Sequence, residues 1–424
     1  MTEALGWSTT RDARWHPAPV GVGRSSQVTV RLDAPRQAME GVGGCFNELG
    51  WDALSQLTEH ERGEVLDLLF GADGAAFDVC RLPVGANDFA RDWYSYEDVP
   101  GTFDLARDET SLIPYVQEAL RRRPGLRLWA SPWSPPTWMK RSQHYTCGAL
   151  GEGEDVLEPA HLEAYARYFA GYVDGYAQHG IRVGMVMPQN EFNSAQVFPS
   201  CCWTPGQLGA FLPLLHKEMA FRGVEVFLGT LERADASLVD EALSGAAARD
   251  AVSGLGLQWA GKGAVAELHA TYPELRIYQT EQECGDGKNT WWYAGYAWDL
   301  VVQYLRNGTN AYLHWNLVLP EGGVSTWGWP QNSLVTVSGE GYRLNHEYWL
   351  MKHLSTAAPA GSTRLDTDGE GLLAFRHADG SVALVVRNAV AEDADLTVQV
   401  GSAHLHVRLP ADSFSTVLVP CEIV

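Results

Sequence analysis

Residues 183–191 read Val-Gly-Met-Val-Met-Pro-Gln-Asn-Glu, a short apolar run that ends in polar side chains. A run of this length fits one buried strand, and in a parallel sheet the polar residues would lie at its carboxyl end. Seven similar runs lie along the chain, with helix-like segments of 3.6-residue spacing between them. The eight runs are residues 42–46, 77–84, 126–130, 183–187, 224–229, 252–258, 276–280 and 310–315.

Alternating strands and helices at this spacing are typical of a (β/α)₈ barrel, which needs eight units over roughly 250–300 residues. A doubly wound open sheet is the alternative, although it usually has fewer strands. The segment Gly41-Val-Gly-Gly also lacks the G-x-G-x-x-G spacing of a dinucleotide-binding turn. We therefore predict an α/β fold, a TIM barrel. The expected helices are residues 52–70, 111–123, 159–179, 205–222, 238–248 and 293–307.

The two ends of the chain differ from the middle. After residue 365 the apolar residues alternate in short runs, and turn residues such as Asp379-Gly380 separate the runs. This pattern predicts a small antiparallel β-module. The stretch 27–32 also has a strand pattern and would join that module. The expected division is residues 1–38 for N-terminal strands of the module, 39–355 for the barrel and 356–424 for the C-terminal module.

The composition restricts the partners. The chain of 424 residues has 31 Lys and Arg against 52 Asp and Glu, a formal net charge of −21. Nucleic acids and anionic membranes would repel such a surface, so we expect neither as a partner. No apolar run is long enough to cross a bilayer, so no membrane insertion is expected. The 16 tryptophans exceed ordinary usage and suggest that some rings contact a ligand.

The first residues contain no basic segment followed by an apolar one, so we expect no signal peptide. The seven cysteines have no framework spacing, which favours a reduced, cytoplasmic setting. Neither the stretch His144-Tyr-Thr-Cys147 nor the pair Cys201-Cys202 has a second ligand pair at zinc spacing, so we predict no metal.

Polar and aromatic residues follow the predicted strands at the barrel face where active sites form. Glu191 follows the fourth strand and Glu281 the seventh, so the two carboxylates would face each other across the barrel mouth. Glu283 is an alternative to Glu281 as the second carboxylate, because alternate residues of a strand share a face. Two carboxylates among tryptophans and amides favour glycoside hydrolysis, which needs an acid and a nucleophile or base. The neighbouring strand ends and loops add Asp88, Trp133, Asn190, Trp259, Trp315, Trp327 and Trp329.

Six motifs occur in an order that resembles glycoside hydrolase family 30, the group of lysosomal glucosylceramidase, β-1,6-glucanases and β-xylosidases. The resemblance covers residues 41–352. It implies a barrel fused to a β-sandwich built from both chain ends, and a retaining mechanism without a cofactor. The motifs are Gly41-Val-Gly-Gly-Cys-Phe, Arg81-Leu-Pro-Val-Gly, Tyr94-Ser-Tyr-Glu-Asp, Ala130-Ser-Pro-Trp-Ser-Pro-Pro-Thr-Trp-Met-Lys, Gln189-Asn-Glu and His314-Trp-Asn-Leu-Val-Leu-Pro-Glu-Gly-Gly.

By position, the resemblance makes Glu191 the acid/base and Glu281 the nucleophile. Asn190 would bind the hydroxyl next to the reacting carbon, and Asp88, Trp133 and Trp315 would bind the sugar at the cleavage site. Arg81 would pair with a site carboxylate and help keep the nucleophile ionised. The expected division is a raised pKa for Glu191 and a lowered pKa for Glu281.

The chain also departs from the family pattern. Phe192 stands where the family usually has proline, and Ala260 replaces a tyrosine that would contact the nucleophile. Trp203 and the stretch Trp327-Gly-Trp-Pro-Gln-Asn332 are the candidates for a different pocket wall. The expected partner is a carbohydrate, and the sequence leaves open the sugar, the linkage, the oligomeric state and the roles of Glu283 and His314. An inactive carbohydrate-binding barrel is the alternative function.

Overall fold

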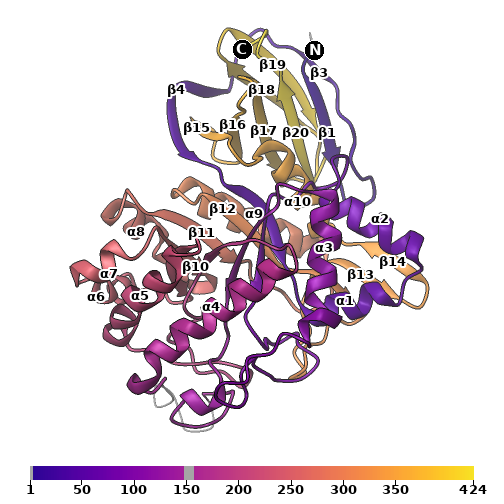
Figure 1. The fold of residues 1–424 in the computed structure, drawn as a ribbon. Coiled ribbons are helices and arrows are strands. Elements are labelled where there is room, and N and C mark those ends of the chain that lie inside the picture. The colour runs from indigo at the N-terminus through magenta and orange to yellow at the C-terminus, as the bar shows by residue number, and fades with distance from the viewer. Residues whose placement is uncertain (1–2, 148–156) are drawn as a thin grey trace.

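The protein is described by a computed structural model that covers residues 3–147 and 157–424. Two β-sheets organise the molecule (Figure 1), and the helix at residues 346–357 packs against both. The predicted segment 1–38 begins with two residues that lie outside the described part. Within the described residues, the helices are too short or too polar to cross a membrane.

The first sheet is a closed parallel barrel, which confirms the predicted fold class. Its eight strands pair in chain order, and β12 pairs with both β11 and β5 to close the ring. The strands are β5 (Gly41–Cys45), β6 (Val79–Pro83), β7 (Arg127–Ser131), β8 (Val183–Val186), β9 (Glu225–Leu231), β10 (Gly254–Gln258), β11 (Arg276–Glu281) and β12 (Ala311–Pro320).

Two of the predicted helices are interrupted in the structure. The segment 52–70 contains two helices because Thr58 caps the second one: its hydroxyl accepts from the Glu61 N–H, and Glu61 accepts from the Thr58 N–H. The segment 238–248 is broken near Gly245. The helices are α1 (Glu48–Ser55), α2 (Glu59–Phe70), α3 (Leu112–Arg122), α4 (Leu162–Gln178), α5 (Pro205–Ala220), α6 (Ser237–Ala242), α7 (Ala246–Asp250), α8 (Val265–Thr271), α9 (Trp291–Arg306) and α10 (His346–Ala357).

The eighth barrel strand continues beyond its predicted end. β12 runs to Pro320 and pairs with β13 (Ser333–Ser338), which forms a hairpin with β14 (Gly341–Leu344). The loop between β12 and β13 carries Trp327 and Trp329. This loop is held at the barrel mouth, because the Thr326 N–H donates to the Asp88 carbonyl at 3.0 Å.

The second sheet combines both ends of the chain. β1 pairs with β20, and β4 lies between β15 and β18. Side chains alternate along β16: Leu372 and Ala374 enter the core of the sandwich, while Leu373 and Phe375 pack with the barrel helices. The strands are β1 (Leu5–Thr9), β2 (His16–Pro17), β3 (Val20–Val22), β4 (Val28–Ala38), β15 (Thr363–Thr367), β16 (Leu372–Arg376), β17 (Val382–Asn388), β18 (Ala394–Val400), β19 (Ala403–Leu409) and β20 (Ser413–Val419).

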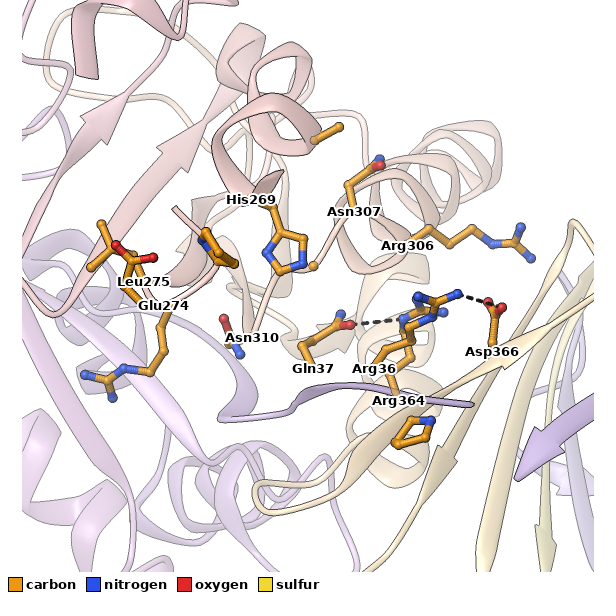
Figure 2. Close-up of a pocket in the computed structure, with 15 residues that line it drawn as sticks. Arg36, Gln37, His269, Glu274, Leu275, Arg306, Asn307, Asn310, Arg364 and Asp366 are labelled. Atoms are coloured by element: carbon orange, nitrogen blue, oxygen red, sulfur yellow. Dashed lines mark hydrogen bonds and ion pairs between the residues drawn. The ribbon is translucent and has the colours of Figure 1, made fainter. Parts of the chain in front are cut away.

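A polar cavity of about 700 Å³ lies between the second sheet and the amino ends of barrel strands β11 and β12 (Figure 2). Three of its charged groups have partners there: Arg36 pairs with Asp366 at 2.8 Å, and Arg364 Nε donates to Gln37 Oε1 at 3.1 Å. The cavity lies at the opposite end of the strands from Glu281. It lies between the barrel and the second sheet and is distinct from the predicted site.

Candidate active site

A second cavity, of about 390 Å³, opens at the carboxyl ends of the barrel strands. It brings together seven of the residues that the sequence pointed to: Asp88, Trp133, Asn190, Glu191, Trp259, Glu281 and Trp329. The rest of its wall consists of Gln196, Phe198, Glu232, Ala260, Lys262, Glu283 and Gln331.

Glu281 ends β11 and is held by several donors. Arg81 Nη1 donates to its Oε2 at 2.8 Å, and the Trp259 indole N–H donates to its Oε1 at 2.9 Å. Gln258 Nε2 adds a longer contact to Oε2 at 3.3 Å. Trp259 thus donates to this carboxylate in a chain that has Ala260 where tyrosine was expected. These donors stabilise the ionised form of Glu281 in a fixed orientation.

Arg81 is the buried centre of the site, although it does not line the cavity. Its Nη2 donates to Asn190 Oδ1 at 2.7 Å and its Nε to Ser131 Oγ at 3.1 Å. The guanidinium lies over the Trp133 ring at 4.3 Å and near the Trp315 ring at 5.6 Å. One cation therefore orients Glu281, Asn190 and two indoles together.

Glu191 follows β8 in an unusual backbone conformation, with φ of 48°. Its N–H donates to Thr230 Oγ1 at 2.8 Å, which fixes the turn. Within the described residues, its carboxyl group accepts only longer bonds, from Gln196 Nε2 at 3.3 Å and from Gln258 Nε2 at 3.4 Å. Both partners are neutral amides, so the ionised form of Glu191 has less support than that of Glu281.

Burial raises the pKa of both glutamates. The pKa of Glu191 lies well above its ordinary value because of burial and the charges of Glu281, Glu232 and Asp88. The expectation of a lowered pKa for Glu281 is wrong: burial raises its pKa, although Arg81, Trp259 and Gln258 oppose that rise. Glu281 accepts bonds from a cation and an indole N–H, whereas Glu191 accepts longer bonds from amides, so Glu191 is the one of the pair suited to retain a proton.

Asp88 presents an unsatisfied carboxyl group to the cavity. Its Oδ2 accepts from Gln331 Nε2 at 3.3 Å, whereas its buried Oδ1 has no hydrogen-bond partner within the described residues. Burial and the charge of Glu281 raise the pKa of Asp88 to about 7. A substrate hydroxyl could supply the missing partner.

Glu283 and His314 have other partners. Lys262 Nζ lies 2.6 Å from Glu283 Oε1, and the Tyr296 hydroxyl donates to Glu283 Oε2 at 2.7 Å. Glu283 thus lines the cavity as half of an ion pair. His314 is buried behind the wall, with Nε2 3.1 Å from Glu347 Oε1.

Aromatic rings form one side of the cavity. Trp259 and Trp329 have ring centroids 5.9 Å apart, and Trp327 lies 5.0 Å from Trp329 and 5.3 Å from Phe198. Trp315 stacks on Trp133 at 5.3 Å. Trp315 and Trp327 do not line the cavity; they support the rings that do.

The residues that sequence reasoning missed fall into two groups. Glu232 stands at a strand end, and the strand-end rule could have found it had the fifth strand been extended from residue 229 to Leu231. Gln196 and Phe198 lie in loops, whose paths leave no periodic signal. Among the described residues, no group of three or more potential ligands is placed to hold a metal ion.

A closed (β/α)₈ barrel with paired carboxylates and indole rings at its strand ends, joined to a β-sandwich, has the design of a glycoside hydrolase. The chain belongs to glycosyl hydrolase family 30. The family's TIM-barrel domain matches residues 39–333, and its β-sandwich domain matches residues 361–417. The protein is therefore a glycoside hydrolase, and the resemblance predicted from its motifs is confirmed.

Relatives and solved structures extend the match over nearly the whole chain. Lysosomal acid glucosylceramidase of Mus musculus is 27% identical, over 92% of this chain and 84% of its own. Endo-1,6-beta-D-glucanase BGN16.3 of Trichoderma harzianum is 23% identical, over 91% and 84%. The crystal structure of SrfJ from Salmonella typhimurium has the same fold, with a TM-score of 0.90, 22% identity, and coverage of 98% of this chain and 99% of that chain.

Proposed function

We propose that the protein is a retaining β-glycosidase in which Glu281 is the nucleophile and Glu191 is the acid/base. The observation that carries this proposal is the unequal support of two buried carboxyl groups on one cavity. A buried arginine and an indole N–H contact Glu281 at 2.8 and 2.9 Å, whereas the donors to Glu191 among the described residues are amides at 3.3 and 3.4 Å. One group is suited to be an anion and the other to hold a proton.

The spacing of the pair supports retention. A single nitrogen, Gln258 Nε2, lies 3.4 Å from Glu191 Oε1 and 3.3 Å from Glu281 Oε2. Such closeness fits the separation of about 5–5.5 Å in retaining enzymes better than the roughly 6.5–9.5 Å that accommodates a water molecule in inverting enzymes.

In the proposed first step, a Glu281 oxygen attacks the anomeric carbon while the bond to the leaving oxygen breaks. Glu191 gives its proton to that oxygen, so a neutral alcohol departs and a glycosyl ester remains on Glu281. In the second step, Glu191 takes a proton from water as the water oxygen attacks the anomeric carbon and the ester bond to Glu281 breaks. The sugar leaves with its configuration retained, and both glutamates return to their starting states.

The sugar-binding groups favour a neutral β-glucoside or a closely related glycoside as substrate. Asp88 Oδ1 is free to accept from a hydroxyl, and Arg81 holds Asn190 Oδ1 so that the amide nitrogen can donate. Trp133 and Trp329 offer apolar faces for the ring. The relatives named glucosylceramidase and endo-1,6-beta-D-glucanase support a β-glucosyl unit.

The test combines leaving groups with variants of the two glutamates. Glu281→Ala should abolish turnover of every nitrophenyl β-glycoside that the wild type cleaves. Glu191→Ala should spare dinitrophenyl glycosides far more than alkyl glycosides, because a good leaving group needs little protonation. The exposed Glu241→Gln is the matched control. Equal losses for both leaving groups, or a fluorosugar label on a residue other than Glu281, would contradict the assignment.

A further inference from the structure

Glu232 is one of five carboxyl side chains that line the cavity, and the catalytic steps do not use it. It follows β9 and is only 7% exposed. Neither carboxyl oxygen makes a hydrogen bond of normal geometry within the described residues, although Arg233 Nε lies 2.8 Å from Oε1. The Arg233 side chain is 52% exposed, so the cation of this ion pair meets solvent while both Glu232 oxygens stay buried. A buried carboxyl group with free lone pairs is costly unless a ligand supplies donors.

The position of Glu232 places it on the leaving-group side of the site. β9 lies next to β8, which carries Glu191, and the Glu232 charge is close enough to raise the pKa of Glu191. The proposed sugar-binding groups Asp88 and Trp133 follow β6 and β7. In the proposed mechanism Glu191 protonates the leaving oxygen. Glu232 lies on the side of Glu191 away from Asp88 and Trp133, so it would contact the departing alcohol.

We infer that Glu232 binds hydroxyl groups of the leaving group, and that the leaving group is itself a sugar. A sugar in that position would offer hydroxyl donors to both Glu232 oxygens. The hydrocarbon of a lipid alcohol would instead bury them without partners. The Lys262–Glu283 pair on the same wall adds polar groups that favour a saccharide. This inference rests on the proposed function and narrows its substrates to β-linked di- or oligosaccharides.

The experiment compares leaving groups in wild type, Glu232→Ala and Glu232→Gln, with Glu241→Gln as the control. The substrates are nitrophenyl β-glucoside, octyl β-glucoside and the β-1,3-, β-1,4- and β-1,6-linked glucose disaccharides. Glu232→Ala should lower kcat/KM for the best disaccharide by about 10- to 100-fold, as expected for a lost bond to a charged group. For the nitrophenyl and octyl substrates, kcat/KM should change by less than about threefold. For the disaccharide, kcat/KM of Glu232→Gln should lie between the values of the wild type and Glu232→Ala.

A second measurement does not depend on how much of the variant folds. Glucose added as an acceptor would occupy the same position in the reverse of the first step, so the ratio of transfer to hydrolysis should fall in Glu232→Ala. A uniform loss over all substrates, or an unchanged ratio, would overturn the inference while the retaining mechanism stands. So would a wild type that cleaves nitrophenyl and octyl glucosides but no disaccharide. A wild type that cleaves none of these substrates would refute the proposed function.

Discussion

Two site residues have backbone conformations that side chains rarely adopt. Glu191 and Trp259 both have φ of 48°, in the left-handed region that favours glycine. Each conformation costs on the order of 1 kcal/mol and persists only where surrounding contacts enforce it. At Glu191 the enforcing contact is the bond to Thr230. The two residues that face Glu281 are therefore held in position by the fold and do not have to be ordered by substrate.

The bond from the Trp259 indole to Glu281 leads to a prediction at the scale of one residue. Trp259→Phe removes a donor that lowers the pKa of Glu281, so that pKa should rise further. Because the proposed nucleophile must be ionised, the acid limb of the kcat/KM profile should move to higher pH, and kcat/KM on that limb should fall about tenfold.

The matched variant is Trp329→Phe. Trp329 contacts Trp259 and lines the cavity, but within the described residues it makes no bond to Glu281. Its acid limb should stay at the wild-type pH, whatever happens to KM. If the two variants shift the limb equally, the indole N–H does not tune the nucleophile.

At the scale of the elements, a local signal interrupts what the apolar pattern treats as one helix. Thr58 and Glu61 form a reciprocal capping box at the start of α2, and Thr58 is exposed. Thr58→Ala should lower the free energy of unfolding by about 1 kcal/mol. Urea denaturation measures this effect, and Thr58→Ser should restore stability because it keeps the hydroxyl. A Thr58→Ser variant as unstable as Thr58→Ala would assign the loss to the methyl group instead.

At the scale of the whole molecule, a buried histidine joins the barrel to the sandwich. His353 on α10 has Nδ1 2.8 Å from Thr416 Oγ1 of β20 and Nε2 2.9 Å from Thr9 Oγ1 of β1. Burial, with the charge of Lys352, lowers the pKa of His353 to about 3. The ring is therefore neutral in the folded protein, where it can serve as both donor and acceptor.

Because His353 is neutral in the folded protein, we expect the free energy of unfolding to fall in acid. The unfolded chain takes up the proton near pH 6.5, so the contribution of His353 is fully present above that pH and falls as the pH drops toward 3. Between pH 7 and 5 the wild type should lose on the order of 2 kcal/mol more free energy of unfolding than His353→Gln does. Buried carboxyl groups affect both proteins alike and cancel in this comparison. Parallel pH dependence would exclude His353 as the cause.

The fold class followed from local patterns, and so did much of the site. Apolar runs such as residues 183–187 carry their own periodicity, and a parallel barrel places Asn190, Glu191 and Glu281 at one face whatever the loops do. The helix break at Thr58 was missed because the apolar pattern outweighed a capping signal. The strands β13 and β14 were missed because their pairing depends on the distant end of β12.

The amino-acid order alone was sufficient to predict the barrel, the β-module and the placement of Glu191 and Glu281 at one face of the barrel. Strand periodicity and strand ends are local properties of the chain. Three-dimensional packing was needed to show that Trp259 donates to Glu281, that Trp315 lies behind Trp133, and that burial raises the pKa of both glutamates. It was also needed to bring Glu232 next to Glu191. Hydrogen bonds and desolvation depend on groups far apart in the chain, and only folding determines their distances.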